Sequence, residues 1–224
     1  MSDAPFVTSW SGGKDSALAF HHTKRAGGQP LAILNVLDET GERTRSHGLR
    51  PEVVQAQANA LGVPLWTARA SWATYEAEFT ALLTRAAEAG ASQAVFGDID
   101  LQAHRDWEEG VCARAGLMPH LPLWLEARRT LVDELLGLGF RALIVAVRED
   151  ALPATLLGRE LDEGLVREIE ALGADACGEN GEYHTVLLDG PDFASPLNLV
   201  PGPAGIHHTG EGSLRVATLD LVLG

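Results

Sequence analysis

Apolar runs alternate with longer stretches of mixed polarity through the first half of the chain. The run that ends at Val7–Trp10 predicts a first strand, and Ala17–Arg25 predicts the helix that follows it. Pro30–Leu37 is apolar almost throughout, which is typical of a strand buried on both faces. Strands alternating with helices predict a parallel α/β sheet with right-handed crossovers. The same pattern predicts two more strands, Val63–Ala68 and Ser92–Phe96, and three more helices, Pro51–Leu61, Thr74–Ala89 and Gln102–Ala115.

The pattern changes after Trp124, where the apolar runs become less regular. We expect Leu117–Trp124 to be irregular because it contains two prolines. A boundary near Glu126 would divide the chain into a Rossmann-like domain over residues 1–126 and a smaller α+β domain over residues 127–224. In the second domain we expect helices at Leu131–Leu138 and Leu161–Leu172, and strands at Arg141–Val147, Val186–Leu188 and Leu214–Leu223.

A glycine-containing motif, Ser11–Ser16, stands between the first predicted strand and helix and reads Ser-Gly-Gly-Lys-Asp-Ser. Backbone N–H groups at a helix N-terminus lack intrahelical partners, and the helix dipole favours an anion there. Gly12 and Gly13 would let the backbone approach phosphate oxygens, and Lys14 would add a positive charge. The spacing differs from Gly-x-x-x-x-Gly-Lys-Ser/Thr and from Gly-x-Gly-x-x-Gly. The motif therefore predicts a phosphate-binding loop of another class; the alternative is a turn that only joins strand to helix.

Polar residues follow the ends of three predicted strands, at Trp10–Gly13, Asn35–Asp38 and Gly97–Asp100. In a parallel sheet these ends converge on one edge, where doubly wound folds bind ligands. We expect a nucleotide in this crevice, with its adenine held by backbone hydrogen bonds from the second strand. The expected nucleotide contacts outside the glycine motif are Ser9, Leu34, Asn35, Val36, His47, Gly97 and Asp98.

A second polar cluster, Gly178–Thr185, precedes a predicted strand in the second domain. Its titratable side chains include a histidine, the usual general base near neutral pH. Alternation along a strand would place Glu182 and His184 on one face. The alternative is a polar hairpin turn with a surface histidine. The cluster predicts a substrate site that comprises Glu179, Asn180, Glu182, Tyr183, His184 and Thr185.

Composition narrows the possible functions. The chain has 224 residues, 46% of them hydrophobic, and a net charge of −14, which makes nucleic-acid binding an unlikely general function. Fourteen acidic residues and three arginines lie in residues 149–224, an excess that suits Mg²⁺ or a cationic substrate. The sequence shows no long apolar run and no signal peptide, so we expect no membrane association. Two cysteines without a CxxC pair fit a cytoplasmic protein.

The glycine motif resembles the PP-loop of the adenine nucleotide α-hydrolase superfamily, whose members cleave ATP between the α- and β-phosphates. Further motifs occur in an order that resembles the diphthine–ammonia ligase family of PP-loop ATPases. The resemblance implies a Rossmann-like PP-loop domain and a second, substrate-binding domain. It also implies adenylation of a carboxylate and displacement of AMP by ammonia. The motifs that carry it are Ser11–Ser16, Gly97–Ile99, Pro122–Trp124, Leu157–Arg159, Gly178–Thr185 and Leu188–Pro191.

Carried over by residue, the resemblance implies that Ser11–Ser16 hold the phosphates and that Asp15 helps to hold Mg²⁺. Lys14 and Asp15 would act in catalysis, and Glu182 or His184 would deprotonate ammonium or an incoming amine. This chain departs from the family motif Gly-Glu-Gly-Gly-Glu-Phe-Glu-Thr at Asn180, Tyr183 and His184. The acid therefore stays open between a small molecule and a protein-borne carboxylate, and the amine donor stays open too.

Two other functions fit parts of the pattern. One is an ATP-binding sensor that resembles universal stress proteins and carries out no chemistry. The other is a PP-loop enzyme that modifies tRNA, against which the missing paired cysteines and the acidic charge count. The sequence also leaves open whether the protein forms a homodimer.

Overall fold

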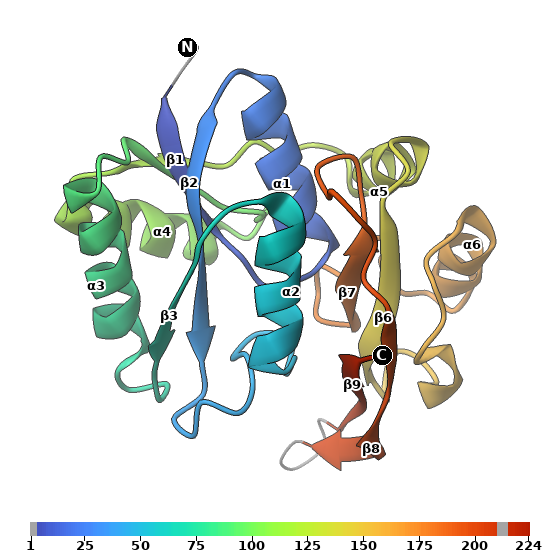
Figure 1. Ribbon diagram of the computed structural model, residues 1–224. Helices are drawn as coiled ribbons and strands as arrows, with labels where there is room; N and C mark the ends of the chain where they lie inside the picture. Colours follow the sequence, from blue (N-terminus) through green and yellow to red (C-terminus); the bar gives the residue numbers. More distant parts are fainter. Residues whose placement is uncertain (1–3, 210–214) are drawn as a thin grey trace.

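The computed structural model describes residues 4–209 and 215–224. Its first half is a five-stranded parallel sheet in the order β3-β2-β1-β4-β5, with four helices (Figure 1). This architecture confirms the predicted Rossmann-like α/β fold. The strands are β1 (Pro5–Ser9), β2 (Gln29–Leu37), β3 (Leu65–Arg69), β4 (Gln93–Val95) and β5 (Met118–His120), and the helices are α1 (Lys14–Arg25), α2 (Pro51–Leu61), α3 (Tyr75–Glu88) and α4 (Gln102–Ala115).

Local sequence explains where several of these elements begin and end. Helix α2 starts at Pro51, whose missing N–H costs nothing in the first turn, and it ends at Gly62 in the left-handed region with φ of 70°. The expectation that Leu117–Trp124 is irregular was wrong, because β5 lies inside it. Strand β5 is three residues long and lies at the sheet edge, where Pro119 is tolerated.

The second half contains a four-stranded antiparallel sheet in the order β7-β6-β9-β8, which confirms the predicted second α+β unit. The predicted strand Val186–Leu188 is longer than expected and takes in the end of the second polar cluster. The start of the predicted strand Leu214–Leu223 lies outside the described residues. The elements are α5 (Arg128–Gly137), β6 (Arg141–Arg148), the 3₁₀ turn η1 (Ala154–Leu156), α6 (Glu163–Ala171), β7 (Tyr183–Asp189), β8 (Leu199–Thr209) and β9 (Val216–Leu223).

Strand β8 was missed by the sequence analysis. It contains Pro201, Gly202 and Pro203, which are typical of turns, and its register against β9 shifts between Pro201 and Ile206. The strand nevertheless forms because it lies at the edge of the sheet and pairs on one side only.

Helices and sheets stack as layers (Figure 1). Helices α3 and α4 pack on one face of the parallel sheet, with Phe79, Leu83 and Val111 in that core. Helices α1 and α2 lie between the other face and the antiparallel sheet, in a core that includes Phe20, Val54 and residues of β6 and β7. Helices α5 and α6 cover the outer side of the antiparallel sheet. One continuous core therefore joins the two halves.

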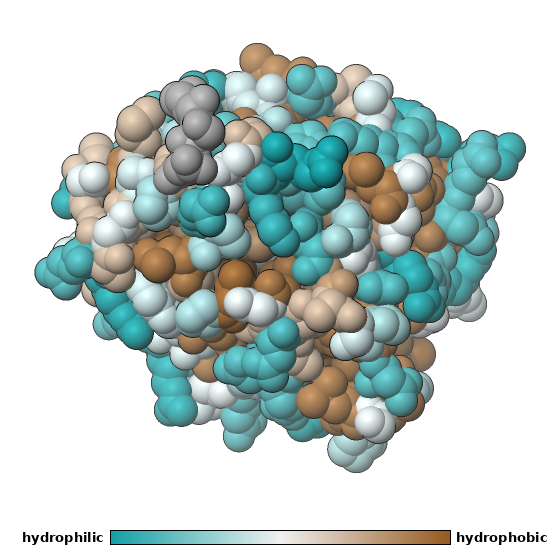
Figure 2. Space-filling view, turned by 45° about the horizontal axis from the view of Figure 1, so that its top comes forward, coloured by the Kyte–Doolittle hydropathy of each residue, from teal (hydrophilic) through white to brown (hydrophobic). Residues whose placement is uncertain are grey.

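The boundary expected near Glu126 lies between β5 and α5, and its use as a domain limit stays a prediction. Among the described residues, no helix has the length and apolar character needed to cross a bilayer. On the face shown in Figure 2, outside the grey residues, hydrophobic side chains form small patches separated by hydrophilic ones.

Candidate active site

A cavity of about 600 Å³ opens at the carboxyl edge of the parallel sheet. One wall comes from the ends of β1, β2 and β4 and from the start of α1, and the facing wall comes from Cys177–Thr185. This is the edge where doubly wound sheets bind ligands, and the volume suits a cofactor-sized molecule. The three predicted strand ends therefore converge as expected.

The glycine motif forms a tight turn into α1. Gly12 has φ of 88°, in the region that favours glycine, and Gly13 occupies the N-cap position without a side-chain cap. A side chain at Gly13 would collide with the His47 ring, and one at Gly97 would lie 2.8 Å from the backbone of Ser16. The loop, the His47 segment and the end of β4 thus pack too closely for any larger residue.

The side chains of the motif face the cavity. Ser11 and Ser16 hydroxyls lie 3.2 Å apart, and both residues contribute to the cavity wall. The buried Lys14 ammonium donates to Asp15 Oδ2 over 2.8 Å and to the Cys177 carbonyl. Although burial opposes its charge, the Asp15 carboxylate raises the pKa of Lys14 above its ordinary value. The Lys14 side chain is therefore positively charged at the position where an anion would meet the helix N-terminus.

Gln57, which the sequence analysis did not single out, helps to hold this loop in place. Gln57 of α2 is fully buried, accepts from Trp10 Nε1 over 2.8 Å, and donates to the carbonyls of Gly12 and Leu187, both over 2.9 Å. The Lys14 N–H donates to Thr185 Oγ1 over 3.1 Å. The glycine motif is thus braced against β7. In the sequence, the one feature that pointed to this role of Gln57 was the position of a glutamine in the middle of an amphipathic helix.

The end of β2 offers a side-chain acceptor rather than open backbone. The Leu34 carbonyl already accepts from Trp10 N, and the Val36 carbonyl accepts from Arg45 N. Asn35 lines the cavity and donates from Nδ2 to the Trp10 carbonyl over 2.7 Å. Its buried Oδ1 receives no hydrogen bond from the residues that the structure describes. Adenine recognition by the backbone of Leu34–Val36 stays a prediction, with the Asn35 oxygen as the open acceptor.

The end of β4 leads into an acidic and aromatic part of the cavity. Asp98 pairs with His104 over 2.7 Å and faces Glu108 of α4. Although burial opposes its charge, hydrogen bonds from His104 and Glu108 hold the pKa of Asp98 below its usual value. Burial and the Asp98 carboxylate raise the pKa of Glu108 to about 11, so Glu108 is neutral at neutral pH. Tyr75 and Trp107 line the same part, and like Glu108 were not predicted.

The facing wall places Glu179, not Glu182, in the cavity. Burial, followed by the charges of Asp15 and Asp98, raises the pKa of Glu179 to about 7. Among the described residues, the cavity wall does not include Asn180 or Glu182.

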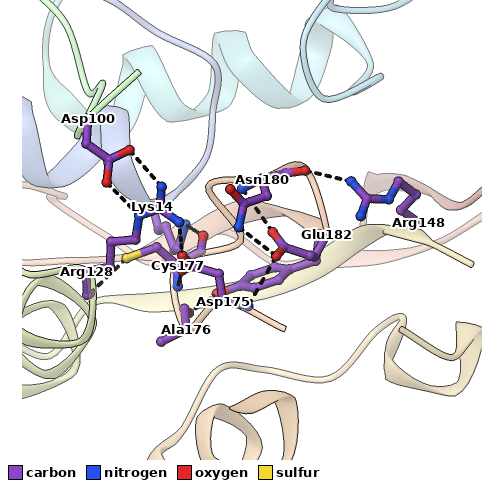
Figure 3. A network of polar contacts seen from close by, with 10 residues as sticks. Lys14, Asp100, Arg128, Arg148, Asp175, Ala176, Cys177, Asn180 and Glu182 are labelled. Carbon is purple, nitrogen blue, oxygen red and sulfur yellow. Dashed lines mark hydrogen bonds and ion pairs between the residues drawn. The ribbon is translucent and has the colours of Figure 1, made fainter. Parts of the chain in front are cut away.

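Glu182 instead ties its own loop together. Its carboxylate accepts from Asp175 N over 3.2 Å and from Asn180 N over 3.0 Å (Figure 3). Although burial opposes its charge, these bonds hold the pKa of Glu182 below its usual value. The expectation that Glu182 and His184 share one face of the site is therefore corrected.

Two basic side chains attach this loop to the first half of the chain. Arg128 pairs with Asp100, which follows β4, over 2.7 Å, and also pairs with Asp175. Lys14 contacts the carbonyl of Cys177, and Cys177 Sγ donates to the Arg128 carbonyl over 2.9 Å (Figure 3). The loop that carries Glu179 is therefore positioned by residues from both halves.

His47 and His184 stack, with ring centroids 4.6 Å apart. His47 Nδ1 donates to the Thr185 carbonyl over 2.8 Å. Burial, followed by the His184 charge, holds the pKa of His47 well below its usual value, and burial with Lys14 lowers that of His184 to about 4. Both rings are thus neutral at neutral pH, and His184 is a weaker base than Glu179.

The structure brings most of the predicted site residues to one cavity. Gly12 and Gly13 shape its loop from behind, and Asn180 and Glu182 hold the facing loop. The predicted residues that line the cavity are Ser9, Ser11, Lys14, Asp15, Ser16, Leu34, Asn35, Val36, His47, Gly97, Asp98, Glu179, Tyr183, His184 and Thr185.

Asp15 is suited to a magnesium ion that is also bound by phosphates. Within residues 4–209 and 215–224, no three His, Cys, Asp or Glu side chains are arranged to hold a metal. Magnesium sites of phosphate-transfer enzymes usually need only one or two carboxylates besides substrate phosphates. Asp15 is partly exposed on the cavity wall at the first turn of α1. Asp15 therefore fits a magnesium ion whose other ligands are the phosphates of a bound nucleotide.

Comparisons with known proteins agree along the chain. The family described as "Diphthamide synthase N-terminal domain" matches residues 6–119, and "Diphthamide synthase C-terminal domain" matches residues 127–216. A diphthine–ammonia ligase of Danio rerio is 29% identical, with 88% of this chain and 87% of that protein covered.

A diphthine–ammonia ligase of Schizosaccharomyces pombe is 24% identical, and the match covers 90% of this chain but 37% of that longer protein. A solved structure described as a predicted subunit of a tRNA methyltransferase from Methanocaldococcus jannaschii aligns with a TM-score of 0.45 and 15% identity, over 85% of this chain and 98% of that one. Because the family matches cover both halves in order, the chain belongs to the diphthamide synthase family.

Proposed function

We propose that the protein is an ATP-dependent ligase that adenylates a carboxylate and transfers the acyl group to ammonia or an amine. One observation carries the proposal: the N-terminus of α1, whose N-cap residue Gly13 has no side chain, shares a cavity with the Lys14 ammonium and with a carboxyl group whose pKa is near neutrality. The first feature stabilises negative charge on phosphate, and the second accepts a proton from nitrogen.

In the first step a carboxylate oxygen attacks the α-phosphorus of ATP. The bond between the α-phosphorus and the bridging oxygen breaks, and pyrophosphate leaves with the negative charge. The Lys14 ammonium and the N–H groups at the start of α1 stabilise that charge where it develops. The hydroxyls of Ser11 and Ser16 add donors at the same wall. Magnesium, held by Asp15 and the phosphates, would further neutralise the leaving group.

In the second step a neutral nitrogen attacks the acyl carbon and forms the C–N bond. The bond between the acyl carbon and the phosphate oxygen breaks, and AMP leaves with the electron pair on that oxygen. The nitrogen must lose a proton. Glu179 is the side chain best suited to receive it, because its pKa of about 7 keeps much of it ionised at neutral pH. This assignment replaces Glu182 and His184 as the base, since Glu182 holds its loop and His184 has a pKa of about 4.

The acid remains the least defined reactant. The relatives are named diphthine–ammonia ligases, so diphthine is the first carboxylate to test. This chain covers 37% of the Schizosaccharomyces pombe relative and 87% of the Danio rerio relative, so more than half of the longer protein lies outside the match. The main proposal is therefore the reaction class with ATP and Mg²⁺. A diphthine-like acid as the substrate is a second, separate proposal.

A carboxylate-dependent exchange of labelled pyrophosphate into ATP tests the first step, and AMP formation on addition of ammonium tests the second. We expect exchange with one carboxylate of a panel that includes a diphthine-bearing protein. Bound ATP without exchange by any acid would instead support the sensor. Exchange that depends on tRNA rather than on an acid would support the tRNA-modifying alternative.

A further inference from the structure

The connection between the two halves of the chain, residues 121–128, meets the facing loop at its last residue. Arg128 donates to the Asp100 carboxylate from Nε over 2.8 Å and from Nη2 over 2.7 Å, and it also donates to Asp175 (Figure 3). Asp100 follows β4, whereas Asp175 lies in the loop that carries Glu179. One guanidinium group therefore joins the parallel sheet to the loop of the proposed base. These contacts form the Arg128 bridge.

Asp175 connects the Arg128 bridge to the backbone of the loop. Its carboxylate accepts from the Cys177 N–H over 2.5 Å, and its own N–H donates to Glu182 over 3.2 Å. Because the Asp175 side chain is only 8% exposed, its charge needs a partner, and Arg128 is the basic group that pairs with it in the described chain. Loss of Arg128 would therefore leave a buried carboxylate without a counter-charge and release the loop from the sheet.

The same connection also holds the backbone that meets Glu179. Although burial raises the pKa of Glu179 most, a hydrogen bond from the Ile99 backbone to its carboxylate lowers it. The Ile99 carbonyl accepts from the Leu125 N–H over 2.7 Å. Leu125 has φ of 61°, which is unfavourable for a leucine, and its side chain is 73% exposed. Its conformation is therefore explained by the hydrogen bond to Ile99 and not by packing of the leucine.

The titratable groups that face Glu179 most closely come from other parts of the fold and from its own loop. Two lie in the first turn of α1, one follows β4, one lies in α4, and one is a thiol of the loop: Lys14, Asp15, Asp98, His104 and Cys177. After burial, the charges of Asp15 and Asp98 raise the pKa of Glu179 most. An effect of Arg128 on Glu179 would therefore come from the position in which it holds the loop.

We propose that Arg128 is a positioning residue for the nitrogen-transfer step, because its bridge holds the Glu179 carboxylate against Ile99 inside the cavity. The proposal rests on the proposed ligase function, which gives Glu179 its role. Among the described residues, Arg128 does not line the cavity, so it acts through Glu179 and not on the reactants. Glu179 takes the proton that the attacking nitrogen loses, and a displaced base would slow that step. The groups that stabilise the departing pyrophosphate lie on the other wall.

Amide hydrogen exchange at Ile99, followed by NMR on the full chain without nucleotide, tests the positioning directly. Arg128→Gln removes the bridge, and Arg128→Lys keeps the charge but lacks the planar fork that reaches two carboxylates. The matched control is Arg129→Gln, because the next residue of α5 pairs with two acids at the surface. Asp100→Asn opens the bridge from the other side and takes the place of Arg128→Gln if that variant does not fold.

We expect the Ile99 amide to exchange at least about tenfold faster in both Arg128 variants and in Asp100→Asn, and at the parent rate in Arg129→Gln. The ammonium-dependent step should fall about tenfold in the same three variants, whereas pyrophosphate exchange should change by less than about twofold.

The pH profile of the ammonium-dependent step gives a second readout. Burial is the largest cause of the raised pKa of Glu179, so a loop that opens lets this pKa fall. At a fixed concentration of neutral ammonia, the rise in rate with pH should therefore shift toward acid by about one unit in the Arg128 variants. The profile of Arg129→Gln should match that of the parent protein.

Unchanged amide exchange at Ile99 in Arg128→Gln would overturn the proposal. An Arg128→Lys variant that behaves like the parent protein would overturn it as well, because charge alone would then be enough. Equal effects in Arg129→Gln would also overturn it, since they would reflect the stability of α5. Melting curves establish that each variant is folded.

The amide measurement needs no turnover, so failure of the positioning role and failure of the ligase function remain distinguishable. A protein that exchanges pyrophosphate but whose Ile99 amide ignores Arg128→Gln keeps the reaction and loses the positioning role. A protein whose Ile99 amide responds but that shows no exchange with any acid supports the bridge and overturns the ligase function.

Discussion

The two walls of the cavity are built by different means. The wall from the parallel sheet is assembled locally, since Ser11–Ser16 join a strand directly to the helix that follows it. The facing wall, Cys177–Thr185, is held by contacts from far away in the sequence. Thr185 meets Lys14 across 171 residues, and Leu187 meets Gln57 across 130 residues. The first wall is therefore a property of the local sequence, and the second is a property of the assembled fold.

This difference divides the chemistry as well. In the proposed reaction, the first wall acts on phosphate through backbone N–H groups and a fixed charge, which depend little on fine positioning of side chains. In the same proposal the second wall acts through the pKa of Glu179, which is raised by burial in the folded wall and then by the charges of Asp15 and Asp98. Substitutions in the two walls should consequently slow different steps of the reaction.

The largest expected effect is that of Lys14→Ala. Removing the ammonium should slow AMP formation about a thousandfold, because a preorganised charge on the departing pyrophosphate is lost. The matched control is Lys24→Ala, since Lys24 is the other lysine of the chain and pairs with Asp192 over 2.9 Å away from the cavity. Single-turnover AMP formation and a melting curve are measured for both. Equal turnover of Lys14→Ala and the parent protein would contradict the phosphate assignment.

Next comes Glu179→Gln, which probes the second wall. We expect the ammonium-dependent step to fall about a hundredfold while pyrophosphate exchange stays near the parent rate. Because burial raises the pKa of Glu179 to about 7, the parent rate at a fixed concentration of neutral ammonia should rise with pH through that value as the carboxylate forms. The substitution should abolish this rise.

His184→Gln is the comparison for that pH profile. The pKa of His184 is lowered to about 4, so the ring is already neutral throughout the range in which Glu179 ionises. The rise near pH 7 should therefore persist in this variant. If His184→Gln removes the rise and Glu179→Gln keeps it, the roles of the two residues are exchanged.

The first wall could be predicted from sequence almost completely. A strand, a glycine turn and a helix are neighbours in the chain, so Ser11–Ser16 carries its own geometry. The ends of β1, β2 and β4 follow from the parallel order of alternating strands. The phosphate-loop side chains that were expected at the cavity are found there. Their roles in binding stay predictions.

The second wall could be predicted only as a cluster of polar residues. Alternation placed Glu182 beside His184, but Glu182 lies before β7, in a turn whose N–H groups bind its carboxylate. Local periodicity does not apply to a turn, so the inference failed there. Glu179, Glu108 and Gln57 matter through partners at least ten residues away or through burial, and neither is visible in a single sequence.

Gln57→Leu tests whether the two walls are joined as one unit. The leucine fills a similar volume but leaves an indole N–H and two carbonyls without their partner. We expect the free energy of unfolding to fall by about 2 kcal/mol, measured by urea denaturation. Gln55→Leu on the same helix is the control, because Gln55 is exposed and binds only Asn59 among its described neighbours. A similar loss in both variants would mean that the brace is unimportant.

The smallest expected effect concerns Asp220, which fastens the segment that carries His47 to the antiparallel sheet. Its buried carboxylate pairs with Arg43 over 2.6 Å and with Arg50 over 2.8 Å. Because both arginines are partly exposed, Asp220→Asn should lower the free energy of unfolding by only about 1 kcal/mol. Asp150→Asn, at an exposed pair with Arg148, should cost less than that.

The stabilisation that Asp220 provides should depend on pH in a definite direction. The hydrogen bond from Arg50, followed by that from Arg43, holds the pKa of Asp220 below its usual value, despite burial. The stabilisation is therefore fully present above the unfolded pKa of about 4 and is lost as pH falls below it. Urea denaturation at a series of pH values should show a constant difference between parent and Asp220→Asn near neutrality, and a shrinking one in acid. A difference that grows in acid would mean that Asp220 stabilises the fold in its protonated form, and that the segment carrying His47 is fastened by something other than this ion pair.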